Sequence, residues 1–305
     1  MKNRFRIVVA MMLVFQIAEM CGGQEAGEAL SDRDFKTHLD RVYATSPSRN
    51  LRLDLYVPDA ELPVPIIVWV HGGAWRQGSK RLSKARVREV VKHGYALASV
   101  EYRLSQEALF PAQIQDCKAA IRWLRAHARQ YGLDPDRIGV WGSSAGGHLV
   151  ALLGTSDGVK SLEVAGDHLD QSSRVQAVCD WFGPTDFLQM NAHAPVPNRL
   201  DHDAANSPES QLVGGAIQDH PDRVHAASPI TYVTSDDPPF LIMHGDRDPL
   251  VPFHQSQLLH RSLQAAGVES KLRRIKGAGH GGPGFHTAGN RHALWAFFDE
   301  HLSRP

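Results

Sequence analysis

The sequence predicts an α/β protein in which a mostly parallel central sheet is covered by helices on both faces. Two observations carry this prediction. Short apolar segments typical of buried strands alternate along the chain with longer amphipathic segments typical of helices. One apolar segment, residues 137–141, leads through the pentapeptide GSSAG at 142–146 into a helix-like segment at 145–153. A strand, a sharp turn and a helix in that order place a serine at the carboxyl end of the sheet.

The expected elements follow one another in a regular order. Residues 39–44 and 51–57 predict two antiparallel strands, because apolar side chains alternate along the second of them. Residues 66–70 are continuously apolar, which is typical of a strand buried on both faces. The further expected strands are 95–102, 137–141, 175–182, 240–244 and 271–275, and the expected helices are 80–93, 111–131, 145–153, 255–266 and 291–302.

Glycine and proline mark the ends of three of these helices. Gly94 and Gly267 follow two of them directly, where a residue with left-handed backbone commonly ends a helix. Pro111 stands at the expected first turn of the 111–131 helix, and Gly132 follows its end. These positions predict where the helices stop and the loops begin.

Composition and charge argue against a nucleic-acid partner. The 305 residues are 42% hydrophobic, which suffices for one sizeable core. Lys plus Arg equals Asp plus Glu at 33 each, so the formal net charge is zero, and no basic block stands out. The 17 His show no H-E-x-x-H or comparable ligand spacing. We therefore expect neither a metal nor another cofactor.

The first residues predict export. Three basic residues within the first six precede an apolar run at 7–18, and the chain turns polar after two glycines at 22–23. We predict a signal peptide over residues 1–23, too short for a stable membrane span, and a secreted or periplasmic protein. Cys21 lacks the small preceding residue that lipidation requires, so we do not expect a lipid anchor there.

Residues 24–305 are expected to form one domain, because no repeat, linker or second core stands out. Within it, residues 183–233 are rich in Pro, Asp and His and interrupt the alternation of strands and helices, which predicts a cap or insert built of short helical pieces. Two cysteines follow the signal peptide. In an oxidising compartment Cys117 and Cys179 either pair or remain two buried thiols, and the sequence leaves both alternatives open.

Ser144, at the centre of the G-x-S-x-G pattern, is the predicted nucleophile. The turn holds this serine in a strained backbone conformation, and Gly142 and Gly146 keep Cβ atoms from colliding around it. A serine hydroxyl becomes a good nucleophile only when a neighbouring base removes its proton, and a third group must orient that base. The rest of the chain must therefore supply a base and an acid.

The acid and the base are expected downstream, in that order along the chain. Asp248 lies in the loop after the 240–244 strand and is the predicted acid. Asp246 is the alternative, although we expect it to shape the turn by binding backbone N–H groups. His280, in a loop of small residues after the last strand, is the predicted base, and His286 is the alternative.

Donors for a developing oxyanion are expected in the loop after residues 66–70. The motif HGGAW at 71–75 stands where an HGGG-type motif belongs, and small residues let backbone N–H groups approach the substrate. We predict donors at Gly73 and Ala74, joined by Ala145, the residue after the nucleophile.

Two tryptophans and one charged pair lie near the predicted site. Trp75 follows the end of one expected strand and Trp181 lies at the end of another, so we predict that they line the acyl or alcohol pocket, with ordinary core packing as the alternative. Tyr102 and the pair formed by Arg103 and Asp116 are expected to be structural, because they can fix the loop before the 111–131 helix.

These motifs together resemble the α/β-hydrolase esterase superfamily, in particular the bacterial feruloyl esterase-like branch of the hormone-sensitive lipase-like group. The resemblance covers residues 39–302 and is carried by HGGAW at 71–75, YRL at 102–104, FPAQIQD at 110–116, WGSSAGGH at 141–148, WFGPTD at 181–186 and HGDRD at 244–248. It implies an α/β-hydrolase fold and a serine mechanism through an acyl-enzyme. The chain departs from the HGGG pattern at Ala74.

The resemblance implies a secreted carboxylic ester hydrolase that acts on short-chain or aromatic esters, such as acetyl or feruloyl groups on plant polysaccharides. The alternative is an amidase, arylformamidase or peptidase with the same triad. A peptidase of this kind usually carries a large propeller domain, for which 305 residues leave no room. A binding module without activity would usually lack part of the triad, and all three parts are present here.

Overall fold

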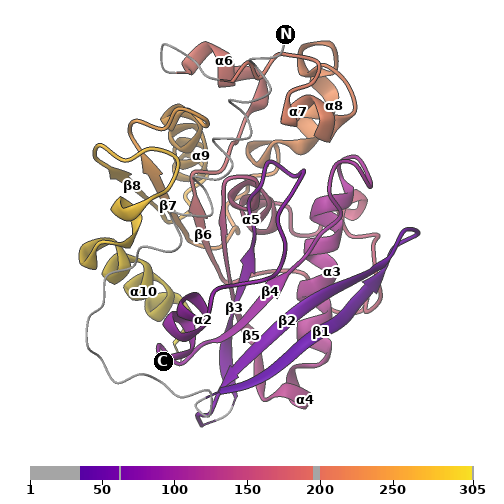
Figure 1. Cartoon of the computed structure of the whole chain (residues 1–305), viewed down its shortest axis with the longest axis vertical. Helices are drawn as coiled ribbons and strands as arrows, with labels where there is room; N and C mark the ends of the chain where they lie inside the picture. Colours follow the sequence, from indigo (N-terminus) through magenta and orange to yellow (C-terminus); the bar gives the residue numbers. More distant parts are fainter. Residues whose placement is uncertain (1–34, 62, 195–199, 304–305) are drawn as a thin grey trace.

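The fold is built on one eight-stranded sheet in the order β1-β2-β4-β3-β5-β6-β7-β8 (Figure 1). The computed structural model describes residues 35–61, 63–194 and 200–303, so the predicted signal peptide lies outside the described residues. The strands are β1 (Phe35–Thr45), β2 (Asn50–Pro58), β3 (Val64–Val70), β4 (Ala96–Val100), β5 (Leu133–Ser143), β6 (Ala177–Trp181), β7 (Phe240–Gly245) and β8 (Ser270–Ile275).

The direction of the strands matches the prediction. Strands β3 to β8 pair in parallel, whereas β2 is antiparallel to both β1 and β4. In β2, Leu51, Leu53 and Leu55 are buried, as expected from the alternation in the sequence. β3 is almost continuously buried, because helices cover both faces of the sheet at its centre.

The helices occupy the predicted segments, and the largest differences concern two of them. They are α2 (Lys84–Val91), α3 (Ala112–Ala126), α4 (Ala128–Tyr131), α5 (Ala145–Thr155), α9 (Phe253–Ala265) and α10 (Ala288–Leu302), with short 3₁₀ turns η1 (Lys160–Leu162) and η5 (Pro283–His286). The expected 80–93 helix begins later, because the Ser83 side chain accepts the Arg86 N–H and caps α2. The expected 111–131 helix is divided at His127, whose φ of -100° and ψ of 7° leave the helical region.

Two apolar cores lie on opposite faces of the sheet. One contains buried side chains of α3, α5 and α9, and the other contains buried side chains of α2 and α10, which lie side by side in Figure 1. Cys117 belongs to the first core and Cys179 to the second, so the sheet separates them. Both are buried free thiols, which decides between the two alternatives that the sequence left open.

Residues 183–233 form the short helical pieces that the sequence predicts. The described pieces are η2 (Phe187–Gln189), α6 (Met190–His193), α7 (Pro208–Val213), η3 (Ile217–Asp219), α8 (Pro221–Ala227) and η4 (Pro229–Thr231). Figure 1 shows α6, α7 and α8 gathered at one end of the molecule. That this segment acts as a cap stays a prediction.

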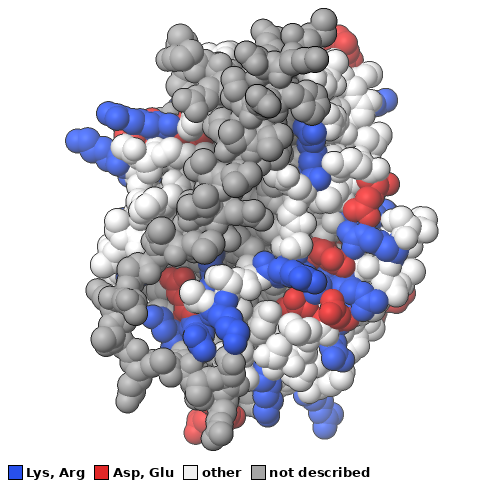
Figure 2. Space-filling model, viewed as in Figure 1, with Lys and Arg blue, Asp and Glu red and all other residues white. Residues whose placement is uncertain are grey.

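The described surface mixes the two signs of charge. In Figure 2, Lys and Arg side chains lie beside Asp and Glu side chains on the face in view. Arg49, for example, pairs with both Glu101 and Glu107. No described helix is both long and apolar enough to cross a lipid bilayer.

Candidate active site

Ser144 lies on a sharp turn between β5 and α5, with a φ of 56° and a ψ of -122°. A positive φ is unfavourable for a residue with a side chain, so the surrounding backbone must hold it in place. A Cβ at Gly142 would lie 2.3 Å from the Gly146 carbonyl oxygen, and one at Gly146 would lie 2.1 Å from the Val70 oxygen. The two glycines therefore permit the close packing that this turn requires.

The structure brings Ser144, His280 and Asp248 together in one hydrogen-bonded chain. His280 Nε2 is 2.9 Å from Ser144 Oγ, and His280 Nδ1 is 2.6 Å from Asp248 Oδ2. The three residues follow β5, β8 and β7, and the carboxyl ends of parallel strands meet at one edge of a sheet. This is the geometry of a serine nucleophile with its base and its acid.

Asp248 is held as a carboxylate. Its side chain is buried, and its Oδ1 accepts hydrogen bonds from the N–H groups of Leu250 at 2.8 Å and Val251 at 2.9 Å. Burial by itself raises the pKa of this carboxyl, but the charge and hydrogen bonds of His280 and His244 outweigh burial and hold the pKa below its usual range. The ionised acid thus accepts the His280 Nδ1 proton.

The two alternatives occupy other places. Asp246 Oδ1 accepts the N–H of Gly277 at 2.7 Å, and its Oδ2 accepts from Arg274 Nε at 3.0 Å, so it shapes the turn as expected. The His286 ring packs against Trp181, with the ring centroids 5.5 Å apart.

The predicted oxyanion donors lie on two adjoining loops. Gly73 and Ala74 have φ values of 111° and 56°, which curl the chain after β3. A Cβ at Gly72 would lie 2.7 Å from the Ser143 carbonyl oxygen, so this loop packs directly on the elbow. Within the described part of the chain, the N–H groups of Gly73, Ala74 and Ala145 have no hydrogen-bond acceptor. Unpaired donors beside the nucleophile fit an oxyanion hole.

Trp75 and Trp181 are core aromatics, contrary to the prediction that they line a pocket. Trp181 is 4% exposed and packs on Trp141 and Phe285, in the core on the α2 and α10 face. Trp75 is 2% exposed and lies against His148, in the opposite core. The sequence predicts that each residue lies beside the end of a strand, but it does not predict the direction of the side chain.

Phe182 and His244 contact the triad and were not predicted. The Phe182 ring lies 4.5 Å from the His280 ring, and its φ of 44° is unusual for a bulky residue. His244 Nε2 lies 3.2 Å from Asp248 Oδ2. Both residues stand within motifs of the sequence, at 181–186 and 244–248, and that position was the only available signal.

The charged pair predicted to be structural fixes the loop before α3. Arg103 donates to both carboxylate oxygens of Asp116, with Nη2 2.6 Å from Oδ1 and Nε 2.9 Å from Oδ2. The neighbouring Tyr102 hydroxyl donates to the His71 carbonyl at 3.0 Å and its ring stacks on the His71 ring. These contacts confirm the structural role and connect the loop before α3 to the HGGAW segment.

A buried carboxyl group lies beside the elbow helix. Asp180 is fully buried, and its Oδ1 accepts the Gly183 N–H at 2.9 Å. Burial raises the pKa of Asp180 to about 7, although the Gly183 hydrogen bond opposes it. A Cβ at Gly147, in the first turn of α5, would lie 2.3 Å from the same oxygen, which shows how closely this carboxyl packs on the elbow helix.

The raised pKa of Asp180 predicts a loss of stability as the pH rises. Its ordinary pKa is 3.8 and its folded pKa is about 7, so between these values the folded state holds a proton that the unfolded chain has released. One pKa unit corresponds to about 1.4 kcal/mol, so this group is expected to lower the free energy of unfolding by a few kcal/mol across that window. Asp180→Asn should remove this part of the pH dependence of the unfolding free energy.

Urea unfolding of wild type and Asp180→Asn across the pH range checks this expectation. The difference in unfolding free energy between the two proteins should change in favour of the variant as the pH rises toward 7 and then level off. Exposed Asp59, directly after β2, provides the matched control, because Asp59→Asn should leave the pH dependence nearly unchanged. A constant difference between wild type and Asp180→Asn would contradict the prediction.

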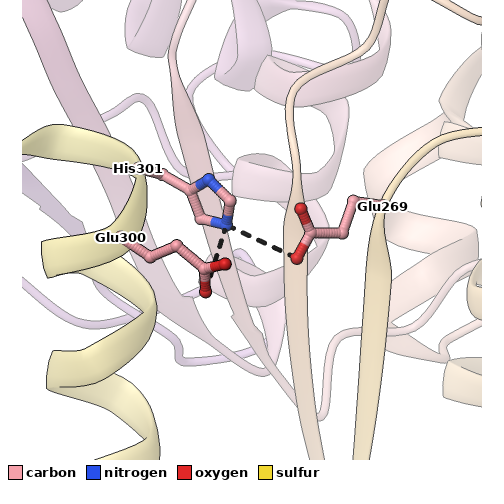
Figure 3. Close-up of side chains that lie close together, drawn as sticks. All are labelled: Glu269, Glu300 and His301. Atoms are coloured by element: carbon pink, nitrogen blue, oxygen red, sulfur yellow. Dashed lines mark ion pairs between the residues drawn. The ribbon is translucent and has the colours of Figure 1, made fainter. Parts of the chain in front are cut away.

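One described cluster of carboxylate and histidine side chains resembles a metal site, and it is better explained by ion pairs. Ligand atoms of Glu269, Glu300 and His301 lie within 4.8 Å of one another (Figure 3). Lys271 Nζ is 2.9 Å from both glutamates and already supplies a positive charge. Glu269 precedes β8, whereas His280 follows it, so the cluster lies toward the other end of that strand.

Comparisons with known proteins find a family and several related proteins. Residues 53–263 match the family model BD-FAE. Esterase LipQ of Mycobacterium tuberculosis is 36% identical over 206 residues, which are 67% of this chain and 47% of LipQ. Esterase LipC of the same organism is 33% identical over 282 residues, which are 90% of this chain and 68% of LipC. The chain therefore spans about half the length of LipQ and about two thirds of LipC.

A solved structure has the same architecture. A truncated form of a carbohydrate esterase from gut microbiota superposes with a TM-score of 0.81 at 35% sequence identity. The match covers 91% of this chain and 100% of that chain. Together with the order and direction of the eight strands, this likeness confirms the α/β-hydrolase fold.

Proposed function

The chain belongs to the BD-FAE family of α/β-hydrolase esterases, and from this premise we propose that it hydrolyses carboxylic esters through Ser144. The observation that carries the proposal is the continuous chain from Ser144 Oγ through His280 to Asp248, at 2.9 Å and 2.6 Å. The relatives LipQ and LipC are both named esterases, which supports the same activity.

The geometry accounts for both halves of the reaction. Ser144 Oγ attacks the acyl carbonyl carbon while His280 Nε2 takes its proton, and Asp248 stabilises the imidazolium that forms. The carbonyl oxygen becomes an oxyanion facing the N–H groups of Gly73, Ala74 and Ala145. The tetrahedral intermediate collapses, and His280 gives the proton to the departing alcohol.

Deacylation repeats these steps with water. His280 removes a proton from a water molecule, which attacks the carbonyl carbon of the acyl-enzyme. The second tetrahedral intermediate then expels Ser144 Oγ, which recovers its proton from His280. The products are one carboxylic acid and one alcohol, and the enzyme returns to its starting state.

For the substrate, we propose short-chain or aromatic esters of carbohydrates, with acetyl and feruloyl groups on plant polysaccharides as the first candidates. The structural neighbour described as a carbohydrate esterase supports this class. The basic and apolar residues at the N-terminus support the proposal that the protein is secreted or periplasmic, where polymeric carbohydrate is accessible.

A substrate series tests the proposed function. We expect p-nitrophenyl acetate, methyl ferulate or acetylated xylan to be cleaved with a kcat/KM at least about 100-fold above that for a formanilide. Acid release is measured directly, so that natural and chromogenic esters are compared on one scale. A preference for the formanilide would assign the site to an arylformamidase-type amidase. Absence of hydrolysis of every ester would contradict the proposal.

A further inference from the structure

A second histidine, His244, contacts the carboxylate of Asp248. It is the penultimate residue of β7 and is fully buried. Its Nε2 lies 3.2 Å from Asp248 Oδ2 and 2.9 Å from the Val251 carbonyl oxygen, and its Nδ1 lies 2.6 Å from Ser256 Oγ on α9. The loop that carries the acid therefore folds over this ring, and both ring nitrogens have partners.

The partners decide which nitrogen carries the proton. A carbonyl oxygen and a carboxylate oxygen have no hydrogen to donate, so Nε2 must carry the hydrogen that they share. In the neutral ring Nδ1 then has a lone pair, which accepts the hydroxyl hydrogen of Ser256. In the protonated ring Nε2 still donates. His244 is thus a donor to Asp248 in either charge state.

Four nitrogen atoms lie around the carboxylate of Asp248. Two backbone N–H groups, those of Leu250 and Val251, donate to Oδ1. His280 donates to Oδ2 at 2.6 Å, and His244 Nε2 lies 3.2 Å from the same oxygen. A carboxylate offers about four lone-pair directions, so its acceptor capacity is filled and its orientation is fixed. Among the described residues, His280 and His244 are the side chains paired with this carboxylate.

We infer that His244 is a positioning residue for the proposed ester hydrolysis: it donates to Asp248 Oδ2 and thereby aims that oxygen at His280. Ser256 acts one step further out, because its hydroxyl donates to His244 Nδ1 and holds the ring in place. The result is a buried chain from Ser256 through His244, Asp248 and His280 to Ser144. This inference rests on the proposed function, since it assigns a role within the same triad.

The residues packed around His244 do not titrate, so a change in the pH profile can be assigned to the histidines on Asp248. The Phe182 ring beyond β6 lies 6.3 Å from the His244 ring, and the Phe253 ring on α9 lies 5.6 Å from it. Neither phenylalanine titrates, and Ser256 on α9 does not titrate either. The titratable groups on Asp248 are therefore His280 and His244, as the causes of its lowered pKa also indicate.

Removal of the His244 donor should lower kcat and move the pH profile. We expect His244→Leu to reduce kcat about 10- to 100-fold with little change in KM, because a small misplacement of a catalytic group slows the reaction without removing substrate contacts. With one donor fewer, Asp248 Oδ2 becomes more basic and stabilises the His280 imidazolium more strongly. The acidic limb of kcat/KM should therefore move to higher pH.

Two further variants separate positioning from packing. The amide of His244→Gln reaches the place of Nε2, so this variant should retain most of kcat and the wild-type acidic limb. Ser256→Ala removes the hydrogen bond to Nδ1 and loosens the hold on the His244 ring, so we expect a smaller loss of kcat than in His244→Leu, with a shift of the limb in the same direction. Buried His202, which pairs with Glu209, provides the control. His202→Leu should lower the melting temperature without moving the pH profile.

The experiment measures kcat, KM, the pH profile of kcat/KM and the melting temperature for all four variants, on p-nitrophenyl acetate. Wild-type kcat and an unmoved acidic limb in folded His244→Leu would overturn the inference. If that variant does not fold, an unmoved limb in Ser256→Ala overturns it instead. A wild-type protein without ester hydrolysis would contradict the proposed function itself, which is a distinguishable result.

Discussion

Replacement of Ser144 by alanine is expected to lower kcat for ester hydrolysis about 10⁶-fold, the loss typical of removing a triad nucleophile. Ser144 Oγ is the atom that forms the acyl-enzyme, and His280 Nε2 stands 2.9 Å from it to take its proton. Without that oxygen, no covalent intermediate forms. The remaining acceleration over water then comes from binding and the oxyanion donors alone. Single-turnover release of p-nitrophenol measures the effect.

Ser143 provides a control within the same turn. Its side chain lies one residue before the nucleophile, and its Oγ has no hydrogen bond to His280. Ser143→Ala should therefore keep kcat within a few-fold of wild type. Mass spectrometry after treatment with a fluorophosphonate should show the adduct on Ser144 in wild type and in Ser143→Ala, and none in Ser144→Ala. Near-normal turnover by Ser144→Ala would reject Ser144 as the nucleophile.

Asp248→Asn is expected to lower kcat about 10⁴-fold, because the shape of the side chain is kept while its charge is lost. Asp248 Oδ2 accepts the His280 Nδ1 proton at 2.6 Å. An asparagine can place its NH₂ there instead, which favours the tautomer with the hydrogen on Nε2. His280 would then have no lone pair directed at Ser144. The rate of acyl-enzyme formation measures the loss.

Asp246→Asn is the matched control for the choice of acid. Asp246 holds the turn through Gly277 and Arg274 and has no hydrogen bond to His280. We expect Asp246→Asn to lower the urea midpoint modestly and to leave kcat within a few-fold of wild type. The opposite pattern, a large kcat loss in Asp246→Asn with normal activity in Asp248→Asn, would show that the acid is misassigned.

Much of the architecture could be predicted because the pattern of hydrophobic residues along each segment agrees with the side chains that are buried. Alternating Leu residues in β2 and the continuous apolar run of β3 reflect how many faces of each strand are covered. The ends of the helices were less certain. α2 begins after Ser83, and the predicted 111–131 helix is divided at His127. Capping contacts and local backbone angles decide these positions, and a pattern of hydrophobic residues does not reveal them.

The members of the site differed in how far the sequence could place them. The triad followed from chain order and loop position, since each residue stands directly after a parallel strand. Trp181 and His244 did not, because both depend on the direction of a side chain. Trp181 turns into the core beneath α10, whereas His244 turns toward Asp248. Successive side chains of a strand point to opposite faces, so a shift of one residue reverses the assignment.

The sequence by itself determined the fold class, the order of the strands and helices along the chain, and the identity of Ser144, Asp248 and His280 as candidates. Those features depend on periodicity, glycine positions and motif order, which are properties of neighbouring residues. The tertiary structure alone decided that Cys117 and Cys179 lie on opposite faces of the sheet and that four donors surround Asp248. These features depend on contacts between distant segments, which form only when the strands assemble into the sheet and the loops pack at one of its edges.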